Sequence, residues 1–344
     1  MFLRIKQFLK GEKPFEYILY KVLTRIQLKS WFDRIYKKRF YKRKNRLDND
    51  VVLEEIETYD GYNQSTHPDI TFFQGKTLLV LTPYPYSNEI YENPCIYYLK
   101  DGKFIQAFKN PVESPETLGF RHHFSDPAFL NLSNKIFLFF RDSLYESETR
   151  KDVIYRLESF DGLVWNNKTI IDYTGNSCIA PSFVEIGDKI AVYYVTDRGT
   201  ETNLFLAKYD NNSFTKGIMV AIANQPIGYT IWHVDVKKHN DIFVGLFTYI
   251  DLKKHKGTRL FLALSADGIE WTIVCQIDFG KKSNVKNLYK ATSHIDSEGK
   301  IVSYISGLDS HMRWFIYKMD ITEKVFNNSN YIKTIRTEKK CEKF

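Results

Sequence analysis

Carboxylates that could carry out chemistry stand at the start of two apolar segments of this 344-residue chain. Asp69 lies in His-Pro-Asp-Ile, and Asp126 lies in Phe-Ser-Asp-Pro. A pair of carboxylates is what acid–base chemistry at a glycosidic bond requires. An aspartate beside a proline also commonly caps a turn, so each residue has a structural interpretation as well.

Basic, imidazole and aromatic side chains accompany the two carboxylates. They are His67, Arg121, His122, His123, Trp232, His233, Lys290 and His294, joined by one further carboxylate, Asp235. Ser125 lies beside Asp126, and Ser177 and Cys178 open a later apolar segment. Such a set suits a phosphorylated or otherwise anionic substrate. The spacing of the histidines matches no zinc motif, so we expect no metal, and we expect no cofactor. Adjacency along one strand also argues against a nucleophilic triad of Ser125 with its neighbours.

Two of these residues have an equally good structural explanation. His233 and Asp235 are two positions apart, which places them on the same face of a strand. They are consistent with a hydrogen-bonded core pair as much as with substrate ligands. Lys290 is consistent with a solvated charge at the rim.

The elements that would position these residues recur along the chain. Intervals of 59, 54, 52 and 59 residues separate the tight turns Gly75-Lys76, Asn134-Lys135, Asp188-Lys189, Asn240-Asp241 and Gly299-Lys300. Each turn precedes a short segment rich in β-branched and aromatic residues, and most units add a further strand. Units of roughly 50 residues with four strands are typical of a propeller, so we predict an all-β, five-bladed β-propeller. Its innermost strands would bring their polar ends to one central pocket.

The positive charge of the chain is concentrated at its N-terminus. Residues 1–47 hold 15 Lys/Arg against 3 Asp/Glu, a charge of +12, which leaves −4 for the rest of a chain with net charge +8. Apolar residues at helical spacing from Phe15 to Tyr36 predict a basic amphipathic helical arm over 1–47. The propeller would follow over 48–325, with a polar C-terminal segment over 326–344.

The arm has two interpretations of equal weight. A helix with aromatics on one face and Lys/Arg on another fits an anionic membrane surface. A helix packed on the propeller, with its basic face in solvent, explains the pattern equally well. No nucleic-acid-reading module accompanies the charge, so no nucleic-acid partner is expected. Without a bilayer-spanning apolar run or a signal peptide, the predicted location is the cytoplasm, including the inner face of the membrane.

Short motifs in this chain resemble those of known five-bladed glycoside hydrolases. The motifs are the Asp69 and Asp126 strand starts and the two Ser-x-Asp-Gly-x-x-Trp hairpins at 159–165 and 265–271. They are similar to the arabinanase and β-xylosidase family, its invertase and levanase relatives, and the mannoside phosphorylases, over residues of about 60 to 320. The resemblance implies a glycan substrate, with Asp69 at the position of the catalytic base. It implies that Asp126 tunes the acid's pKa and holds the substrate.

One departure from that family limits the chemistry. The family's general acid is a Glu two residues before the proline that opens blade three, where this chain has Ile179 before Pro181. A sugar already activated by phosphate needs no such acid, so the sequence favours a membrane-surface glycosyltransferase in cell-surface glycan assembly, with a sugar-phosphate donor.

Two alternatives remain open. A hydrolase or phosphorylase would need a substitute acid, for which Glu146 and Glu148 are the nearest candidates. A glycan-binding propeller without chemistry would use aromatics such as Tyr84, Tyr86 and Trp232.

Overall fold

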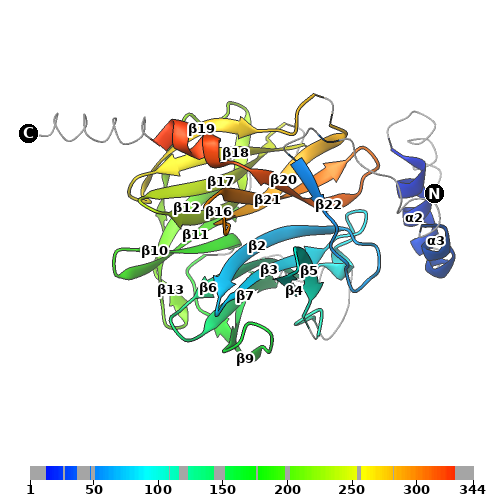
Figure 1. The fold of residues 1–344 in the computed structure, drawn as a ribbon, viewed down its shortest axis with the longest axis horizontal. Coiled ribbons are helices and arrows are strands. Elements are labelled where there is room, and N and C mark those ends of the chain that lie inside the picture. The colour runs from blue at the N-terminus through cyan, green and yellow to red at the C-terminus, as the bar shows by residue number, and fades with distance from the viewer. Residues whose placement is uncertain are drawn as a thin grey trace, which may run out of the picture.

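A computed structural model gives the fold of the chain. It describes residues 13–25, 28–36, 47, 51–107, 109–115, 123–142, 152–175, 177–197, 202–253, 257–281 and 283–329. Five antiparallel sheets make up a β-propeller (Figure 1), which confirms the predicted fold class.

The first three blades run outward from the channel in chain order. Blade one is β2 (Ser65–Phe73), β3 (Lys76–Pro83), β4 (Cys95–Lys100) and β5 (Lys103–Gln106). Blade two is β6 (Phe124–Asn131), β7 (Ile136–Asp142), β8 (Val153–Ser159) and β9 (Asn166–Ile171). Blade three is β10 (Ile179–Ile186), β11 (Lys189–Asp197), β12 (Thr202–Asp210) and β13 (Ser213–Phe214), with β14 (Ile218–Met219) also paired to β12.

The last two blades each recruit a strand from earlier in the chain. Blade four is β16 (Tyr229–His239), β17 (Ile242–Asp251), β18 (Thr258–Ser265) and β19 (Glu270–Ile277), with β15 (Ala221–Ala223) parallel to β19. Blade five is β20 (Val285–Ile295), β21 (Ile301–Asp309) and β22 (Trp314–Asp320), and β1 (Val51–Glu54) is its outermost strand.

The ring is closed by this pairing of the first strand with the last blade. Val51 lies opposite Met319 and Glu54 opposite Ile316 in an antiparallel ladder. On the inside, β2 contacts β6, β6 contacts β10, β10 contacts β16, β16 contacts β20, and β20 contacts β2. The five innermost strands therefore surround one central channel.

The hydrophobic core lies between the blades. One cluster of buried side chains joins blades four and five, including Leu262 and Tyr317, and another joins blades one and five, including Leu79 and Ile316. Three further clusters join the remaining neighbouring blades. Each blade is therefore held by apolar burial on both faces, as the near-continuous apolar strands of the sequence require.

The two Asp-Gly hairpins have the structural role expected from their sequence. Asp161 Oδ1 accepts hydrogen bonds from the backbone of Leu163 at 2.8 Å and Val164 at 2.9 Å, and Ser159 Oγ accepts one from Gly162 at 2.9 Å. The same bonds recur in the hairpin at 265–271. These turns fix the outer strands of blades two and four.

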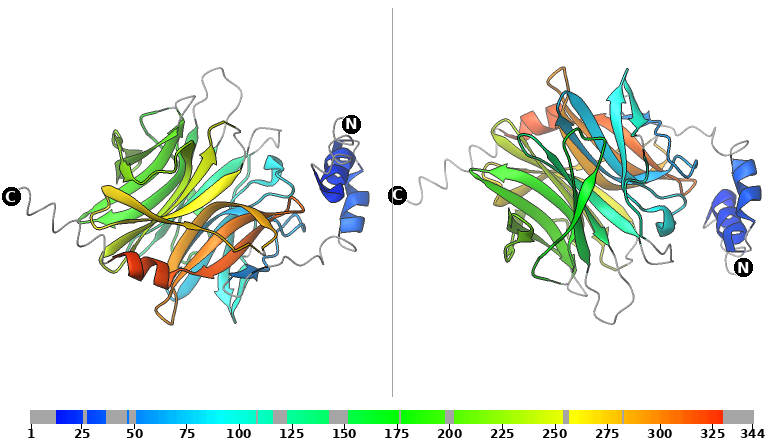
Figure 2. Two further views of the ribbon diagram at one scale, coloured as in Figure 1. Left: turned by 90° about the horizontal axis from the view of Figure 1, so that it is seen from above. Right: turned by 90° about the horizontal axis from the view of Figure 1, so that it is seen from below.

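The N-terminal arm packs against the propeller. Its helices α2 (Phe15–Arg25) and α3 (Lys29–Ile35) lie beside the sheets at the end marked N (Figures 1 and 2). A buried cluster contains Tyr20, Leu23, Phe32 and Tyr36 from the arm with Tyr62 and Tyr86 from blade one. The face that bears these residues is thus covered by protein rather than by lipid.

Polar contacts fix the same interface. Tyr36 donates to the backbone oxygen of Tyr62 at 2.9 Å, and Asn88 Nδ2 donates to the Tyr20 hydroxyl at 2.7 Å. Glu16 is 1% exposed, with its Oε1 3.6 Å from His311 Nδ1 and 3.8 Å from Arg313 Nε.

A short helix over 322–329 follows blade five and crosses the predicted domain boundary at residue 325. None of the helices in the described part of the chain has the length and hydrophobicity of a membrane span.

Candidate functional site

Three of the innermost strands share an irregularity near their first residues. His67, Asp126 and Ala180 each precede a proline and have φ of 52°, 52° and 49°. The strand pairing shifts register at each of these places. A bulge of this kind changes the direction in which a side chain points. His67 and Asp126 are therefore equivalent positions of blades one and two, and Asp69 is equivalent to Ala128 and Ser182.

His67, Asp126 and His233 meet in the channel. Asp126 Oδ1 lies 3.0 Å from His233 Nε2 and 3.6 Å from His67 Nε2. The two imidazole rings stack with their centroids 5.2 Å apart. All three side chains are buried, and one potential metal-ligand atom from each lies within 4.8 Å of the others. We refer to this trio as the His–Asp–His cluster.

Glu92 binds the imidazole nitrogen of His67 that faces away from Asp126. His67 Nδ1 lies 2.9 Å from Glu92 Oε1 and 3.1 Å from the Thr82 hydroxyl, which leaves Nε2 directed toward Asp126. The second oxygen of Glu92 is 3.6 Å from His123 Nε2. A histidine whose far nitrogen is bound to a carboxylate is the usual arrangement of a metal ligand, because that bond fixes the tautomer and the ring orientation.

Arg141 binds the carboxylate oxygen of Asp126 that faces away from the histidines. Its Nε donates to Asp126 Oδ2 at 3.0 Å, while its other nitrogens reach Asp152 Oδ2 at 3.3 Å and Ser125 Oγ at 3.1 Å. Oδ2 of Asp126 is thus engaged by the guanidinium, and Oδ1 is the oxygen that faces the histidines.

Burial and charge set the protonation of the cluster. Burial lowers the pKa of His233 to about 4, although Asp126 opposes the shift, so this imidazole is neutral at neutral pH. Burial alone would raise the pKa of Asp126, but Arg141 and the two histidines outweigh it and hold the pKa well below its usual value. Burial would likewise raise the pKa of Glu92, and His67 and His123 lower it below its usual value. A neutral imidazole and an ionised carboxylate are the forms that bind metals.

Aromatic side chains form one wall beside the cluster. The ring of Tyr289 lies 4.4 Å from His233 and 5.5 Å from His67, measured between centroids. Trp232 Nε1 donates to the Tyr289 hydroxyl at 3.0 Å, and both side chains are partly exposed. Trp314 continues the wall at 5.4 Å from Tyr289. Partly exposed rings beside buried polar groups suit the stacking of a sugar.

Asp69 lies in a separate group deeper along the strands. Its carboxylate accepts hydrogen bonds from the backbone of Ile70 at 2.8 Å and Phe129 at 2.6 Å, and from the Thr292 hydroxyl at 3.1 Å. Lys237 Nζ also donates to it at 2.6 Å. Asp69 therefore links blades one, two, four and five.

The other predicted residues divide between these places. Trp232 and His123 lie beside the cluster, while Lys290 is buried and donates to the Pro127 backbone oxygen at 3.1 Å. Asp235 belongs to the deeper group, 3.6 Å from Lys237 Nζ. His294 is near the far end of β20 against Tyr304, so it is not at the strand start where the sequence placed it.

The remaining predicted residues are not seen in the site. Tyr86 is fully buried under the arm, in the cluster with Tyr20, Phe32, Tyr36 and Tyr62. Arg121, His122, Glu146 and Glu148 lie outside the described residues.

Three important residues were missed from the sequence. Glu92 lies in the loop between β3 and β4, outside the strand starts that the repeat singled out, and Tyr289 is one of many tyrosines. Arg141 had a usable signal, because it ends the otherwise apolar run Ile136–Phe140, where a charge must find a buried partner.

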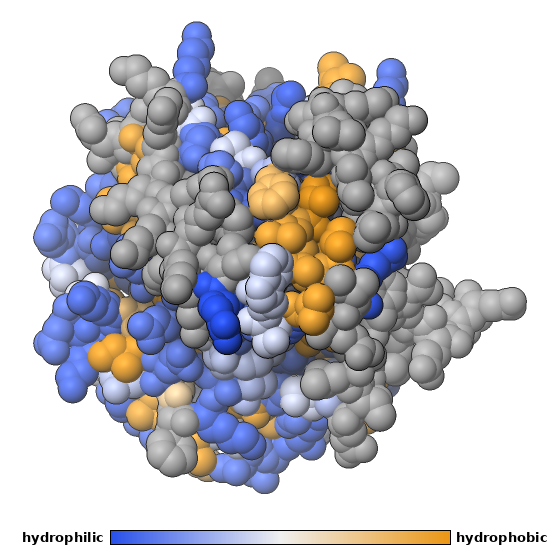
Figure 3. All heavy atoms as spheres, turned by 90° about the vertical axis from the view of Figure 1, so that its right-hand side faces the viewer, coloured by the Kyte–Doolittle hydropathy of each residue, from blue (hydrophilic) through white to orange (hydrophobic). Residues whose placement is uncertain are grey.

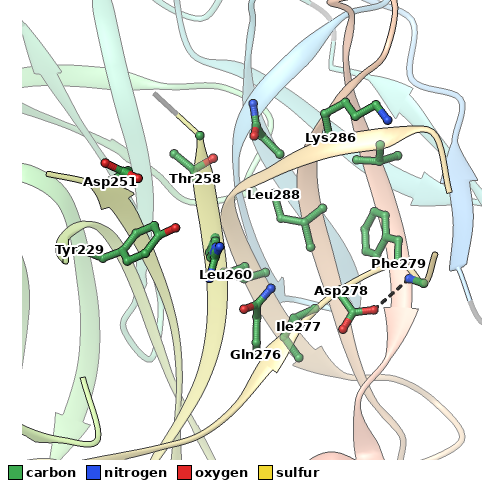
Figure 4. Close-up of a pocket in the computed structure, with 15 residues that line it drawn as sticks. Tyr229, Asp251, Thr258, Leu260, Gln276, Ile277, Asp278, Phe279, Lys286 and Leu288 are labelled. Carbon is green, nitrogen blue, oxygen red and sulfur yellow. Dashed lines mark hydrogen bonds between the residues drawn. The ribbon is translucent and has the colours of Figure 1, made fainter. Parts of the chain in front are cut away.

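A pocket of about 390 Å³ lies between blades four and five (Figure 4). It is lined by Tyr229 at the start of β16, Asp251 at the end of β17, and Lys286 and Leu288 near the start of β20. These strand ends are on the same side of the molecule as the His–Asp–His cluster, and Tyr289 follows Leu288 directly. A larger pocket of about 710 Å³, lined by residues from 53 to 57 and 100 to 106, lies on the outer side of blade one.

Comparisons with known proteins identify the architecture. No family model matches the sequence, and no curated protein matches it. Among solved structures, an N-acetylgalactosamine deacetylase from F. plautii aligns over 81% of this chain and 96% of its own, with 17% identity and a TM-score of 0.66.

An arabinofuranosidase and an endo-arabinase have the same fold. The α-L-arabinofuranosidase from Lactobacillus brevis aligns over 75% of this chain and 90% of its own, with 12% identity and a TM-score of 0.57. The endo-arabinase from Bacteroides thetaiotaomicron aligns over 75% and 94%, with 12% identity and a TM-score of 0.55. The predicted resemblance is confirmed at the level of the fold: the chain has the five-bladed β-propeller of the arabinanase-like glycoside hydrolases.

Proposed function

We propose that this protein is a metal-dependent hydrolase that removes an acyl group from a glycan. The observation that carries the proposal is the convergence of His67 Nε2, His233 Nε2 and Asp126 Oδ1 in a buried channel. Two imidazoles and one carboxylate are a common ligand set for a catalytic divalent ion, which keeps a further position open for substrate or water.

The residues around the cluster fit such an ion. Glu92 would keep Nε2 of His67 unprotonated and directed inward, and Arg141 would keep Oδ1 of Asp126 in place. A divalent ion held there would act as a Lewis acid on a carbonyl oxygen and activate water for attack on it. The protein itself contributes the orientation of the ligands, the exclusion of bulk water by burial, and an aromatic wall for the sugar.

The choice of an acyl group over a glycosidic bond rests on two further observations. The position of the family's general acid is Ile179, which is apolar and 2% exposed, so it cannot protonate a leaving sugar. In hydrolysis of an amide or ester, the proton that the metal-activated water loses would pass to the leaving amine or alcohol, so an acid at the position of Ile179 is not required. The F. plautii neighbour is a deacetylase, which supports a substrate of the N-acetylated amino-sugar class.

Glycosyl transfer from a phosphate-activated donor is the second candidate. The sequence supported this candidate because basic residues were expected to line the pocket. In the structure, Lys290 donates to a backbone oxygen and His233 lies against Asp126, so these two groups are engaged within the protein. The observation that still favours transfer is the basic arm beside the site, which would suit a lipid-linked substrate.

The experiment compares the candidates in one set of assays. The purified chain is expected to retain about one divalent ion and to release acetate from N-acetylgalactosamine or N-acetylglucosamine glycans. Chelation should abolish the reaction, and Asp126→Asn should reduce it at least ~100-fold because a ligand is lost. Asp188→Asn, in an exposed hairpin, serves as the matched control.

Other outcomes would assign the protein differently. Release of a chromogenic leaving group from an arabinoside or xyloside would make it a glycosidase. Nucleotide release from a nucleotide sugar would make it a transferase. Glycan binding that survives Asp126→Asn without any turnover would make it a binding module, and each of these results overturns the deacylase proposal.

A further inference from the structure

The arm has a second face, which points away from the propeller. Figure 3 views the side of the molecule where α2 and α3 lie and shows hydrophobic side chains gathered near the centre of that side, with a few hydrophilic ones at the edge of the patch. Large apolar residues of the arm remain exposed: Phe15 at 52%, Leu28 at 49% and Trp31 at 51%. Val22 follows Phe15 seven positions later, on the same side of the helix, and is half-buried.

This exposure is not explained by packing of the arm. The opposite stripe of α2, which includes Glu16, Tyr20 and Leu23, already covers the buried tyrosine cluster. A helix of a soluble domain needs only one such apolar stripe. Phe15, Leu28 and Trp31 lie outside this stripe and keep about half of their surface exposed.

The charges beside these exposed side chains have one sign. The described part of α2 and α3 carries Lys21, Arg25, Lys29 and Arg34, of which Arg25 and Arg34 are exposed. Its acids are Glu16, buried against Arg313, and Asp33, which lies 3.2 Å from Lys29 Nζ. The outward face of the arm is thus apolar at the centre and cationic at the edges.

We propose that this outward face docks on the surface of an anionic lipid bilayer. Phe15, Leu28 and Trp31 would enter the boundary between headgroups and acyl chains, and the arginines would lie at the level of the lipid phosphates. A second copy of this chain is a less suitable partner, because it would bring like charges together around the apolar centre.

Docking would also orient the catalytic side of the propeller. The arm rests on Ser87, whose hydroxyl accepts a hydrogen bond from Trp314 Nε1 at 3.0 Å, and Trp314 contacts Tyr289 in the aromatic wall. The His–Asp–His cluster would therefore open close to the bilayer. This places the enzyme where membrane-attached glycans are found, independently of which reaction it catalyses.

Vesicle flotation with the full chain tests the proposal. The protein is expected to float with vesicles that contain phosphatidylglycerol and to remain in solution with pure phosphatidylcholine. Replacing Phe15, Leu28 and Trp31 together by serine should weaken binding at least about tenfold. A control with Phe72, Ile227 and Phe326 replaced by serine changes residues of equal or greater exposure elsewhere, at 64%, 99% and 51%, and should float like the wild type.

A second variant tests the electrostatic part. Arg25→Glu with Arg34→Glu should also weaken flotation about tenfold or more, and high salt should have the same effect. The proposal is overturned if the wild type does not bind anionic vesicles or if the serine variant of the arm binds as tightly as the control. It is equally overturned if light scattering shows a dimer that the arm variant converts to a monomer.

Discussion

Asp69 and Asp126 look alike in the sequence but differ in their surroundings. Asp126 has one oxygen directed at two histidines, whereas Asp69 has its oxygens occupied by four donors from four blades. Such an arrangement of donors suits a structural anchor better than a base. The resemblance placed the catalytic base at Asp69, and we assign its role to holding the blades together.

Asp69→Asn is expected to lower the free energy of unfolding by about 3 kcal/mol, because it leaves the buried ammonium of Lys237 without its closest partner. Urea denaturation measures this change. Lys237→Met should cost less when combined with Asp69→Asn than in the wild type, since the lysine has then already lost its partner. Normal stability of Asp69→Asn together with loss of turnover would return Asp69 to the catalytic role.

Glu92 should act on the metal through His67. Glu92→Gln is expected to weaken divalent-ion affinity by about 10–100-fold, with a smaller change in stability, because the imidazole loses the partner that fixes its tautomer. Isothermal titration with zinc or manganese measures the affinity. Glu89→Gln, in the same loop, is the matched control, and equal affinities for the two variants would contradict the assignment.

His239 makes the fold sensitive to acid. Burial, with Lys237 and His294 nearby, lowers its pKa from 6.5 to about 4, and its Nε2 is hydrogen-bonded to Ser293 Oγ at 3.1 Å. Between pH 6.5 and pH 4 this imidazole is protonated in the unfolded chain but neutral in the folded one. The free energy of unfolding therefore falls as the pH drops toward 4, and below pH 4 this group causes no further loss.

His239→Gln should therefore reduce the loss of stability between pH 7 and pH 4.5 by on the order of 2–3 kcal/mol. Urea midpoints at several pH values measure it. The loss should shrink rather than vanish, because His294 and His233 have pKa values shifted in the same direction. An unchanged pH dependence would show that His239 already titrates normally in the folded protein.

At the scale of elements, the tight turns and apolar strands could be predicted because they depend on neighbouring residues. Each Asp-Gly hairpin satisfies its own backbone with residues at most a few positions away, and this information is local. The bulges at His67 and Asp126 were not predicted. They arise where a strand meets its neighbours in the ring, and the same X-Pro pair at Ala180 carries no functional group.

Two turn glycines allow the cost of backbone strain to be measured separately from the cost of a steric clash. Gly268 has φ of 76°, and a Cβ there would lie 2.7 Å from Ile186 Cδ1, whereas Gly299 has φ of 78° with open space around it. Gly299→Ala should cost about 1 kcal/mol from the backbone alone, and Gly268→Ala should cost about 1–3 kcal/mol more because blade four no longer fits against blade three. Thermal unfolding of the two variants measures the difference, and equal costs would show that Ile186 moves aside freely.

At the scale of the whole molecule, repeat spacing predicted the number of blades, and the resemblance predicted the fold. The cluster itself could not be found this way, because its members are far apart in the sequence and come from blades one, two and four. Spacing rules for metal motifs recognise ligands on one local segment. A ring of strands brings side chains together from distant segments instead, so spacing along the sequence could not indicate the His–Asp–His cluster.

Pairing of β1 with β22 should contribute strongly to stability. A chain that lacks residues 1–54 is expected to unfold at a clearly lower temperature than one that lacks residues 1–46, because only the longer deletion exposes the edge of blade five and uncovers Val51's partners in the core. Hydrogen exchange should show faster exchange in β22 in the longer deletion alone. Similar melting temperatures would mean that blade five is complete without β1.

The pairing of β1 with β22 also determines when during synthesis the propeller can close. β1 leaves the ribosome long before β22 is made, so the ring stays open until nearly all of the chain has been synthesised. The seat of the arm includes His311 and Arg313, which come from the same last blade and receive the buried Glu16. A nascent chain thus lacks the blade-five part of the surface that receives its N-terminal helices, and the ion contacts of Glu16 can form only once the last blade is in place.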